Sequence, residues 1–511
     1  MQLPILSILI FFPVLGIVLL VFLPRKNHRL LKLTTLGLSL VEFGLSLPLW
    51  FRFDSKTAAM QFTERYNWLP QYGINYILGL DGFSLLLVLL TTFLTPLCVL
   101  ATWEDIQTRV KEFMICLLAL MSGMIGVFVA LDLFLFYVFW EVMLIPMYLL
   151  IGVWGHPARR VYAAIKFFLY TMFGSLLMLV AILVLYFYHG KVTGVYTFDL
   201  LKLYGLNIPF HLQFWMFLAF GLAFAIKVPM FPFHTWLPDA HTEAPTVGSV
   251  ILAAVLLKMG TYGFLRFNMP LFPEAAYYFV PLFSILAIIG IVYGALVCIV
   301  QKDLKRLIAF SSVSHLGFVM LGLFTFNVPG IQGGVIQMIN HGLSTGALFF
   351  IVGMIYERRH TRMIADFGGL STPMPVYAAI FMIVALSSIG LPGLNGFVGE
   401  FLVLLGTFKV NKIYATIAAT GVILAACYML WMFQRVMFGE CTKPENQALR
   451  DLSTREIAIF VPLLLFIVWI GVYPSTFLSK TEATTTAFVA KMEQAKATKV
   501  SLSQVFKGEA R

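Results

Sequence analysis

The chain has 511 residues, of which 60% are hydrophobic and only 12% are charged, and its mean hydropathy is +0.90. These values lie well outside the range of soluble globular domains. The formal net charge of +11 could indicate nucleic-acid binding. However, Lys and Arg lie in short clusters between apolar stretches, which is how membrane topology is encoded. We therefore expect one polytopic domain in contact with the lipid bilayer and no nucleic-acid partner.

Apolar stretches of about 20 residues recur along the chain, and each is long enough to cross ~30 Å of hydrocarbon. The first has no basic leader and no small-residue cleavage site, so it is interpreted as a retained span and not a signal peptide. The sequence predicts an all-α polytopic membrane protein with about fourteen transmembrane helices. They are expected near 3–23, 30–51, 80–102, 113–131, 133–153, 162–188, 213–237, 246–267, 277–299, 307–326, 331–356, 376–408, 411–438 and 456–473.

Basic clusters occupy alternate connections between these spans and, by the positive-inside rule, are expected to face the cytoplasm. They are Arg25, Lys26, Arg29 and Lys32; Arg109 and Lys111; Arg159 and Arg160; Lys302, Lys305 and Arg306; and Arg358, Arg359 and Arg362. An even number of spans then puts both termini on the periplasmic side of a bacterial inner membrane. The basic tail runs against this rule, although charge at a tail translocated last is a weak signal. Its cations are Lys491, Lys496, Lys499, Lys507 and Arg511.

Helix breakers interrupt two spans deep inside, at Lys227-Val-Pro-Met-Phe-Pro232 and at Gly390-Leu-Pro-Gly-Leu-Asn-Gly396. Unpaired backbone is tolerated at that depth only where protein or a water-filled cavity covers it. Paired breaks in corresponding halves indicate an inverted-repeat transporter with ion sites near the midplane, although ordinary proline kinks are an alternative. Because the breaks lie five spans apart, we expect inverted five-helix repeats at 113–270 and 271–440. Three N-terminal helices at 1–112 and a C-terminal helix with its tail at 441–511 would flank them.

Four charged residues, Glu141, Lys227, Lys258 and Glu400, lie near the middle of predicted spans. Each would cost roughly 2.5 to 3.5 kcal/mol if it were unpaired in the membrane. A carboxylate near a buried lysine helps to hold its proton, so moving or neutralising that carboxylate can release the proton. The four charges therefore favour a proton relay, with a passive buried salt bridge as the alternative.

Histidines add further candidates for the relay. His315 and His341 fall within apolar spans beside Ser and Asn, where an imidazole can relay protons or simply pack with hydrogen bonds. His234, a weaker candidate, follows Lys227 by two helical turns and would share its face if the helix continues past the break. We expect His156, in a basic connection, to be solvated. A metal site is not expected because the spacing is not a known ligand pattern; the residues weighed for it are His234, Asp239, His241 and Glu243.

Redox or nucleotide cofactors have no visible site on this chain. Its five cysteines form no CxxC pair or other cluster. It also has neither a GxGxxG nor a GxxxxGK[ST] motif. If the function is linked to redox chemistry, that chemistry is expected on other chains.

Several long motifs resemble the antiporter-like subunits shared by respiratory complex I, membrane-bound hydrogenases and multisubunit cation/proton antiporters. They are FWEVMLIPMYLLIGVWG, AIKVPMFPFHTWLPDAHTEAPT, LLKMGTYG, KDLKRLIAFSSVSHLGFV, QMINHGLSTGALF and LPGLNGFVGEF. The resemblance implies two inverted repeats, each with a proton half-channel. It also implies that Glu141 pairs with Lys227, that Lys258 passes protons toward the central axis, and that His315 and His341 join the polar path.

Most members of this family have a lysine at the second break, where this sequence has Glu400. That difference, the overall length and the lack of a C-terminal lateral helix extension resemble the subunit M branch of complex I more than subunits L and N. The resemblance implies a proton-translocating subunit of an NADH-quinone oxidoreductase beside subunits L and N. NADH, FMN, iron–sulfur clusters and quinone would be bound by other subunits. A subunit of a Na⁺/H⁺ antiporter and a non-conducting scaffold are the alternatives, and Asp132 is interpreted as a helix cap.

Overall fold

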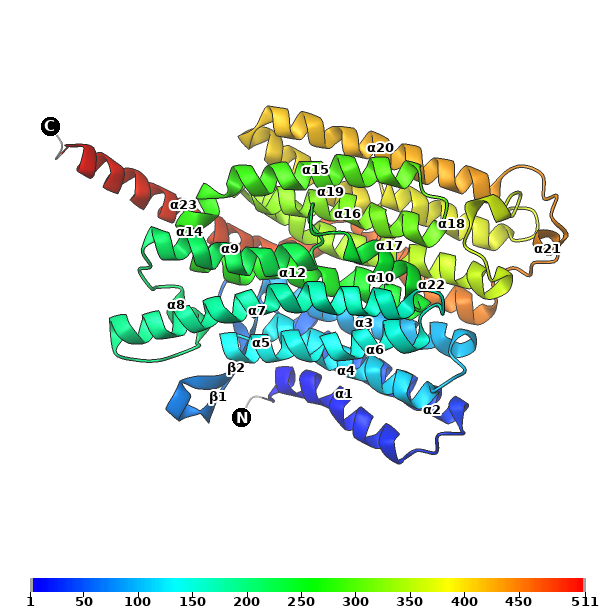
Figure 1. Cartoon of the computed structure of the whole chain (residues 1–511), viewed down its shortest axis with the longest axis horizontal. Coiled ribbons are helices and arrows are strands. Elements are labelled where there is room, and N and C mark those ends of the chain that lie inside the picture. Colours follow the sequence, from blue (N-terminus) through cyan, green and yellow to red (C-terminus); the bar gives the residue numbers. More distant parts are fainter. Residues whose placement is uncertain (1–2, 509–511) are drawn as a thin grey trace.

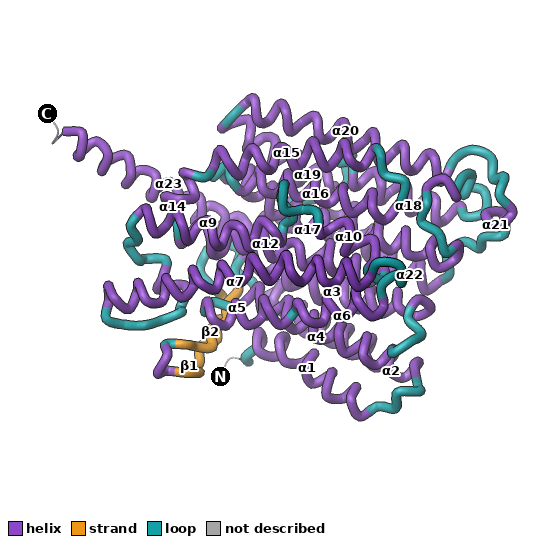
Figure 2. Tube along the Cα trace, viewed as in Figure 1, coloured by secondary structure: helices purple, strands orange, loops and turns teal. Residues whose placement is uncertain are grey.

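The fold is a bundle of long, nearly antiparallel helices (Figures 1 and 2). The computed structural model describes the backbone of residues 3–508 and the side chains of residues 3–496. In that part of the chain, thirteen helices are long and apolar enough to cross a membrane. The remaining predicted span, 376–408, coincides with two shorter helices that are not among these thirteen, α18 (Pro375–Ser388) and α19 (Asn395–Val410). All predicted spans coincide with a helix or helix pair, so the prediction of an all-α polytopic membrane protein is confirmed.

The helices follow one another with short connections. The first group is α1 (Ile5–Phe22), α2 (His28–Arg52), α3 (Gly82–Asp105), α4 (Val110–Val129), α5 (Leu133–Val142), α6 (Leu144–Trp154), α7 (Arg160–Thr193) and α8 (Leu200–Leu203). The next is α9 (Phe210–Lys227), α10 (Trp236–Glu243), α11 (Thr246–Ile251), η2 (Leu252–Leu256), α12 (Leu257–Gly263), η3 (Phe264–Asn268), α13 (Met269–Leu271) and α14 (Pro273–Tyr278). The last is α15 (Val280–Ile299), α16 (Leu304–Leu323), α17 (Val328–Arg359), η4 (Ile364–Asp366), α18 (Pro375–Ser388), α19 (Asn395–Val410), α20 (Lys412–Met437), α21 (Pro444–Gln447), α22 (Thr454–Val472) and α23 (Ser475–Gly508).

A β-hairpin, absent from the sequence prediction, closes one end of the bundle. Strand β1 (Gln61–Leu69) pairs antiparallel with β2 (Ile74–Leu80), and the short helix η1 (Pro70–Tyr72) joins them. The first amides of a helix lack partners within the helix. The hairpin supplies one, because Glu64 Oε1 accepts a hydrogen bond from Leu6 N at 2.8 Å. Asp132 caps α5 as predicted, accepting from Leu135 N at 3.2 Å, and also accepts from Asn75 N of β2 at 3.0 Å.

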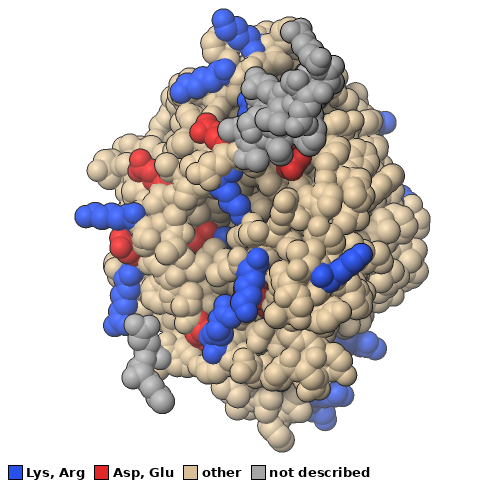
Figure 3. All heavy atoms as spheres, turned by 90° about the vertical axis from the view of Figure 1, so that its left-hand side faces the viewer, with Lys and Arg blue, Asp and Glu red and all other residues tan. Residues whose placement is uncertain are grey.

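The two ends of the bundle differ in character. The connections with the predicted basic clusters lie at one end, which we call the basic end; in Figure 1 it is marked by the α1–α2 connection and α21. The hairpin and both termini lie toward the opposite end, which we call the hairpin end. Figure 3 views the hairpin end, where Lys and Arg are interspersed with Asp and Glu. The strongest clustering of positive charge is thus at the basic end.

The tail predicted after the last span is instead a 34-residue helix, α23. It packs against α3, α14 and α17 before it projects beyond the bundle (Figure 1). Lys491 Nζ lies 3.7 Å from the centre of the Tyr204 ring. Burial, assisted by the charge of Arg266, lowers the pKa of Lys491 to about 8. The tail cation Arg511 lies outside the described residues, as do the side chains of Lys499 and Lys507.

Candidate functional site

The first predicted break is confirmed. Helix α9 ends at Lys227, α10 begins at Trp236, and residues 228–235 between them form turns. Lys227 is 1% exposed, and its Nζ has no hydrogen-bond partner among the described residues. That nitrogen lies 5.4 Å from the Trp140 ring centre and 5.5 Å from that of Phe167, within cation–π distance. The ammonium is thus placed at the end of a helix, against aromatic faces and away from bulk solvent.

Glu141 lies beside a third interruption, which was not predicted although Pro146 has no N–H to bond the Val142 carbonyl four residues earlier. Helix α5 ends at Val142 and α6 begins at Leu144, so Glu141 is in the last turn of a short helix. Its Oε1 is buried and has no hydrogen-bond partner in the described part of the chain. The expected direct ion pair between Glu141 and Lys227 is not formed there, although the two charges interact electrostatically. The lysine ammonium lies against the ring faces of Trp140 and Phe167 instead.

The other predicted relay residues meet in one buried cluster. Lys258 Nζ lies 2.6 Å from His341 Nδ1. His315 Nδ1 lies 2.7 Å from Glu400 Oε1, and the two histidine ring centres are 6.0 Å apart. None of these four residues is more than 3% exposed. Segments far apart in the chain, α12, α16, α17 and α19, therefore bring a lysine, two histidines and a glutamate into a row.

Two π-helical segments, η2 and η3, position Lys258. They flank α12, which carries this residue. A π-helical turn often marks a functional site, because its wider turn disturbs the regular hydrogen-bond ladder. Here the Ala253 carbonyl accepts a hydrogen bond from Lys258 Nζ. No residue type or spacing in this apolar stretch indicated the π-helical turns.

Glu400 follows the second break, which is also confirmed. Helix α18 ends at Ser388 and α19 begins at Asn395. Glu400 Oε1 accepts a second hydrogen bond, from Gln337 Nε2 at 3.0 Å, whereas Oε2 has no partner among the described residues. Gly390 has φ +78°, and a Cβ there would lie 3.5 Å from Oε2, so glycine suits both the backbone and the space beside this oxygen.

Further polar side chains surround this cluster, and those outside the His315 and His341 motifs, such as Tyr428 and Ser387, were not predicted from the sequence. His315 Nε2 lies 3.3 Å from the Tyr428 hydroxyl. Asn340 Nδ2 donates to the Asn395 carbonyl at 2.7 Å, and Ser344 Oγ lies 2.6 Å from Ser387 Oγ. A cavity of about 10 Å³ between these groups is close to the minimum that admits one water molecule. The polar path thus extends from α12 to the second break.

His234 lies in the first break, so the helix does not continue past Lys227 and the condition for a shared helix face is not met. Its ring packs 5.3 Å from that of Tyr293, and its Nδ1 has no partner within the described chain. Two of the other residues weighed as metal ligands form ion pairs elsewhere. Asp239 Oδ2 lies 2.7 Å from Lys166 Nζ, and Glu243 Oε2 lies 3.8 Å from His156 Nδ1. No group of three or more His, Cys, Asp or Glu suited to a metal ion occurs among the described residues.

Two family descriptions match the chain. Residues 130–426 match "NADH:quinone oxidoreductase/Mrp antiporter, TM", and residues 8–127 match "NADH-ubiquinone oxidoreductase chain 4, amino terminus". NADH-quinone oxidoreductase subunit M of Rhodobacter capsulatus is 50% identical over 483 residues, which are 92% of this chain and 93% of that protein. NADH-ubiquinone oxidoreductase chain 4 of Arabidopsis thaliana is 48% identical over 473 residues, 93% of this chain and 94% of that protein.

Solved structures share the fold. A chain of respiratory complex I from Thermus thermophilus superposes with a TM-score of 0.87 at 33% identity, covering 95% of this chain and 99% of that chain. A chain of the Mrp complex from a Dietzia species superposes with a TM-score of 0.82 at 20% identity, covering 96% and 100%. The second likeness concerns the fold alone.

Proposed function

The chain belongs to the subunit M (chain 4) family, the proton-translocating membrane subunits of NADH:quinone oxidoreductase (complex I), and we propose that Glu141, Lys227, Lys258, His315, His341 and Glu400 carry its protons. His234, beside the first break, is a weaker member of this set. The observation that carries the proposal is the buried row from Lys258 through His341 and His315 to Glu400. A passive salt bridge needs only two of these groups, whereas a relay needs neighbours that can pass a proton on.

Charge coupling between Glu141 and Lys227 supplies the other half of the relay. A lysine in a dry site keeps its proton only while a carboxylate stabilises the charge. Glu141 interacts electrostatically with Lys227 without contacting it. Neutralising or displacing Glu141 would therefore favour proton release from Lys227 without first breaking a hydrogen bond. Glu141, Lys227 and Lys258 would lie in the first of two inverted five-helix repeats, 113–270, and His315, His341 and Glu400 in the second, 271–440. Each repeat contains one of the two predicted breaks.

Glu141 and Glu400, the two carboxylates of the proposed relay, lie beside surfaces that other membrane subunits can cover. Val142 and Ile145, next to Glu141, are 46% and 59% exposed, and Phe401, next to Glu400, is 50% exposed. We assign these surfaces to the related antiporter-like subunits L and N. NADH, FMN, iron–sulfur clusters and quinone are assigned to other subunits. The basic end faces the cytoplasm of a bacterial inner membrane in this proposal, with both termini periplasmic.

Proton pumping by membranes that carry Glu141→Gln tests the proposal. The substitution keeps the size of the side chain and removes its charge, so we expect at least a ten-fold loss of pumping and a parallel loss of quinone reduction. Glu141→Asp should retain part of both activities. A native gel must show that each variant assembles. Normal rates and proton yields in assembled Glu141→Gln membranes would leave the chain a scaffold and refute the relay.

A further inference from the structure

An apolar groove outside the relay opens on the outer surface of the bundle between α2 and α22. Helices α3 and α17 line it as well, and the start of α23 closes it at the hairpin end. It has a volume of about 210 Å³, and every side chain that lines it is aliphatic or aromatic. Its edge faces outward, because Phe51 is 77% and Trp469 is 47% exposed. We call this feature the α2–α22 groove.

A closed series of aromatic contacts joins the four helices α2, α3, α22 and α23 at this groove. The distances between ring centres are 5.8 Å for Phe43–Phe93, 5.0 Å for Phe93–Phe466, 5.9 Å for Phe466–Trp469, 5.5 Å for Trp469–Phe477 and 5.6 Å for Phe477–Trp50. Phe43 and Trp50 lie two turns apart on α2, which closes the series. Ring pairs at these distances stabilise one another, so the walls of the groove are formed before any ligand binds.

The α2–α22 groove extends over one half of the membrane span. On α2 its lining runs from Phe43 to Phe51, which is roughly 12 Å at a rise of about 1.5 Å per residue. On α17 it includes Ile339 and Leu343, which lie near the middle of that helix. One half of the hydrocarbon core is ~15 Å thick. The groove therefore matches the depth of the acyl chains in one leaflet, measured from the hairpin end.

The size and lining of the groove suit a single flexible chain. A transmembrane helix with its side chains is about 10 to 12 Å across. Sites for drug-sized ligands usually have volumes of about 300 to 1,000 Å³ and contain a few polar groups that fix the ligand's orientation. A groove of about 210 Å³ with an aliphatic and aromatic lining is too small for a helix and lacks such groups. An acyl chain is narrow and requires no polar partner.

A lysine lies at the hairpin end of the groove. Lys480 follows Phe477 by about one turn of α23. Its Nζ donates to the carbonyls of Trp50 and Phe53, both at 3.4 Å, and lies 5.1 Å from the centre of the Trp50 ring. An ammonium has three donors, so one remains available. Within the described part of the chain no carboxylate forms an ion pair with Lys480, and its charge is therefore available to an external anion.

We propose that the α2–α22 groove binds one acyl chain of an anionic phospholipid from the leaflet at the hairpin end, with the lipid phosphate beside Lys480. Lipid tails are as apolar as the groove, so moving a chain into it gains no hydrophobic energy relative to the bilayer. Selection of one lipid over another must therefore come from the headgroup. The Lys480 ammonium provides it by a charge-assisted hydrogen bond to the phosphate. Tryptophans such as Trp50 and Trp469 are typical of this interfacial level.

Photolabelling of the assembled complex in lipid nanodiscs tests the site. The probe is phosphatidylglycerol with a diazirine near the middle of one acyl chain, diluted into phosphatidylcholine. We expect mass spectrometry to find the label on the peptides of α2 and α22 that line the groove. Unlabelled phosphatidylglycerol should compete for these positions, whereas unlabelled phosphatidylcholine should not. The same diazirine on phosphatidylcholine is the second probe, and it should label these peptides more weakly.

Variants separate the headgroup contact from the groove itself. Lys480→Gln should lower labelling by the phosphatidylglycerol probe about five-fold, the effect expected for one basic residue near an anionic membrane surface. Lys480→Arg should retain most of the labelling. Leu47→Trp fills the groove from α2, where Leu47 is 36% exposed, and should remove the label from both helices. Arg52→Gln is the matched control, because Arg52 is exposed at the same helix end but lines a separate hollow with Glu64.

Three results would overturn the assignment. Equal labelling of the parent protein by the two probes would make the groove an ordinary lipid-facing surface, and this comparison does not depend on the assembly of any variant. Absence of label from α2 and α22 would show that another subunit covers the groove. Equal losses in Lys480→Gln and Arg52→Gln would assign the preference to general surface charge. Proton pumping does not enter any of these measurements, so the lipid site and the relay stand or fall separately.

Discussion

Lys258 and His341 share a hydrogen bond of 2.6 Å between Nζ and Nδ1, with Lys258 0% and His341 3% exposed. An ammonium has only donors, so while Lys258 is charged, Nδ1 must accept and His341 is neutral with its proton on Nε2. Once the proton moves, Nδ1–H donates to the neutral amine. The same bond serves both states, so transfer along it needs no change of partner.

His341→Ala removes this bond and interrupts the row between Lys258 and His315. We expect proton pumping to fall at least ten-fold, which corresponds to about 1.4 kcal/mol or more in the barrier. Because the helix packing around α17 is otherwise kept, the complex should still assemble on a native gel. His211→Ala, at an exposed histidine, should pump normally. Unchanged proton yield in assembled His341→Ala would mean that water alone bridges the gap.

Glu400 and His315 act as a pair if the relay passes through their 2.7 Å contact. Glu400→Gln keeps a carbonyl oxygen for Gln337 but cannot bind or stabilise a proton, and His315→Gln removes the imidazole. Each should lower pumping about ten-fold. Groups that work as a unit give non-additive losses, so the double variant should be no worse than either single one. If the loss of pumping in the double variant equalled the product of the two single losses, Glu400 and His315 would not act in one shared step.

The burial of the charged residues and the positions of the helix breaks could be predicted from the sequence. An ionisable side chain in an apolar span is costly, so Lys258 and Glu400 had to lie inside the protein. Proline and glycine at 227–232 and 390–396 likewise indicated breaks, with proline kinks as the alternative, and the chain leaves the helix at 228–235 and 389–394. Both inferences depend on local composition alone, and both are confirmed.

Features that depend on three-dimensional packing were not predictable in the same way. The π-helical turn before Lys258, Leu252–Leu256, occurs in a stretch whose residues are all compatible with a regular helix. The interruption after Glu141 lies four residues before Pro146, a signal that the sequence analysis did not use. The aromatic rings against the Lys227 ammonium, Trp140 and Phe167, come from two different helices, α5 and α7. Asp105 was not singled out in the sequence, and its buried oxygen without a described partner becomes noticeable only in the folded chain. His241 was weighed only as a metal ligand, and its stacking on Phe349 depends on packing.

Asp132 gives the hairpin end a pH-dependent stability. Burial, opposed by three backbone hydrogen bonds and assisted by Asp199, raises the pKa of its carboxyl to about 6. The unfolded value is about 3.9. A folded-state pKa above the unfolded one favours the protonated fold, so this stabilisation is complete below about pH 4 and is lost as the pH rises through 6.

As the pH rises from 5 to 7.5, deprotonation of Asp132 should lower the free energy of unfolding by about 1 kcal/mol. Unfolding of the full-length chain in mixed micelles with increasing SDS would measure the change. Asp132→Asn, which still caps a helix, should show a smaller drop over the same range. An equal drop in the variant and the parent would assign the pH dependence to other groups.

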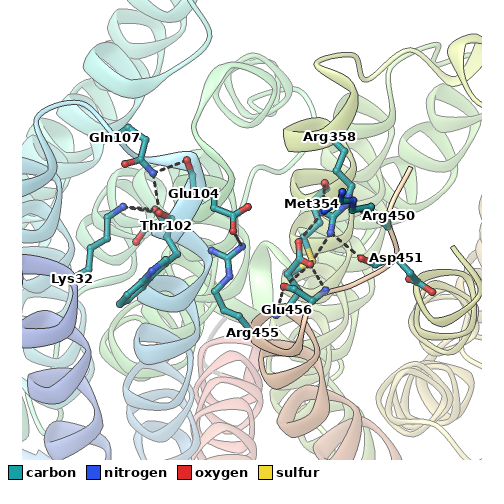
Figure 4. Close-up of polar contacts among 12 residues, drawn as sticks. Lys32, Thr102, Glu104, Gln107, Met354, Arg358, Arg450, Asp451, Arg455 and Glu456 are labelled. Carbon is teal, nitrogen blue, oxygen red and sulfur yellow. Dashed lines mark hydrogen bonds and ion pairs between the residues drawn. The ribbon is translucent and has the colours of Figure 1, made fainter. Parts of the chain in front are cut away.

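Arg358 and Glu456 form the strongest contact of the network in Figure 4, with side chains only 18% and 3% exposed. Arg358→Met would leave the Glu456 carboxylate buried without its cation, which typically costs about 3 kcal/mol or more. We expect less assembled complex on a native gel and dissociation of the extracted complex at a lower temperature. Lys443→Met is the matched control, because its pair with Asp366 is 3.7 Å long and about two-fifths exposed on both sides. Such surface pairs contribute roughly 0 to 1 kcal/mol, so the control should assemble normally. If both variants were equally stable, apolar packing and not these ion pairs would hold the helix ends together at the basic end of the bundle.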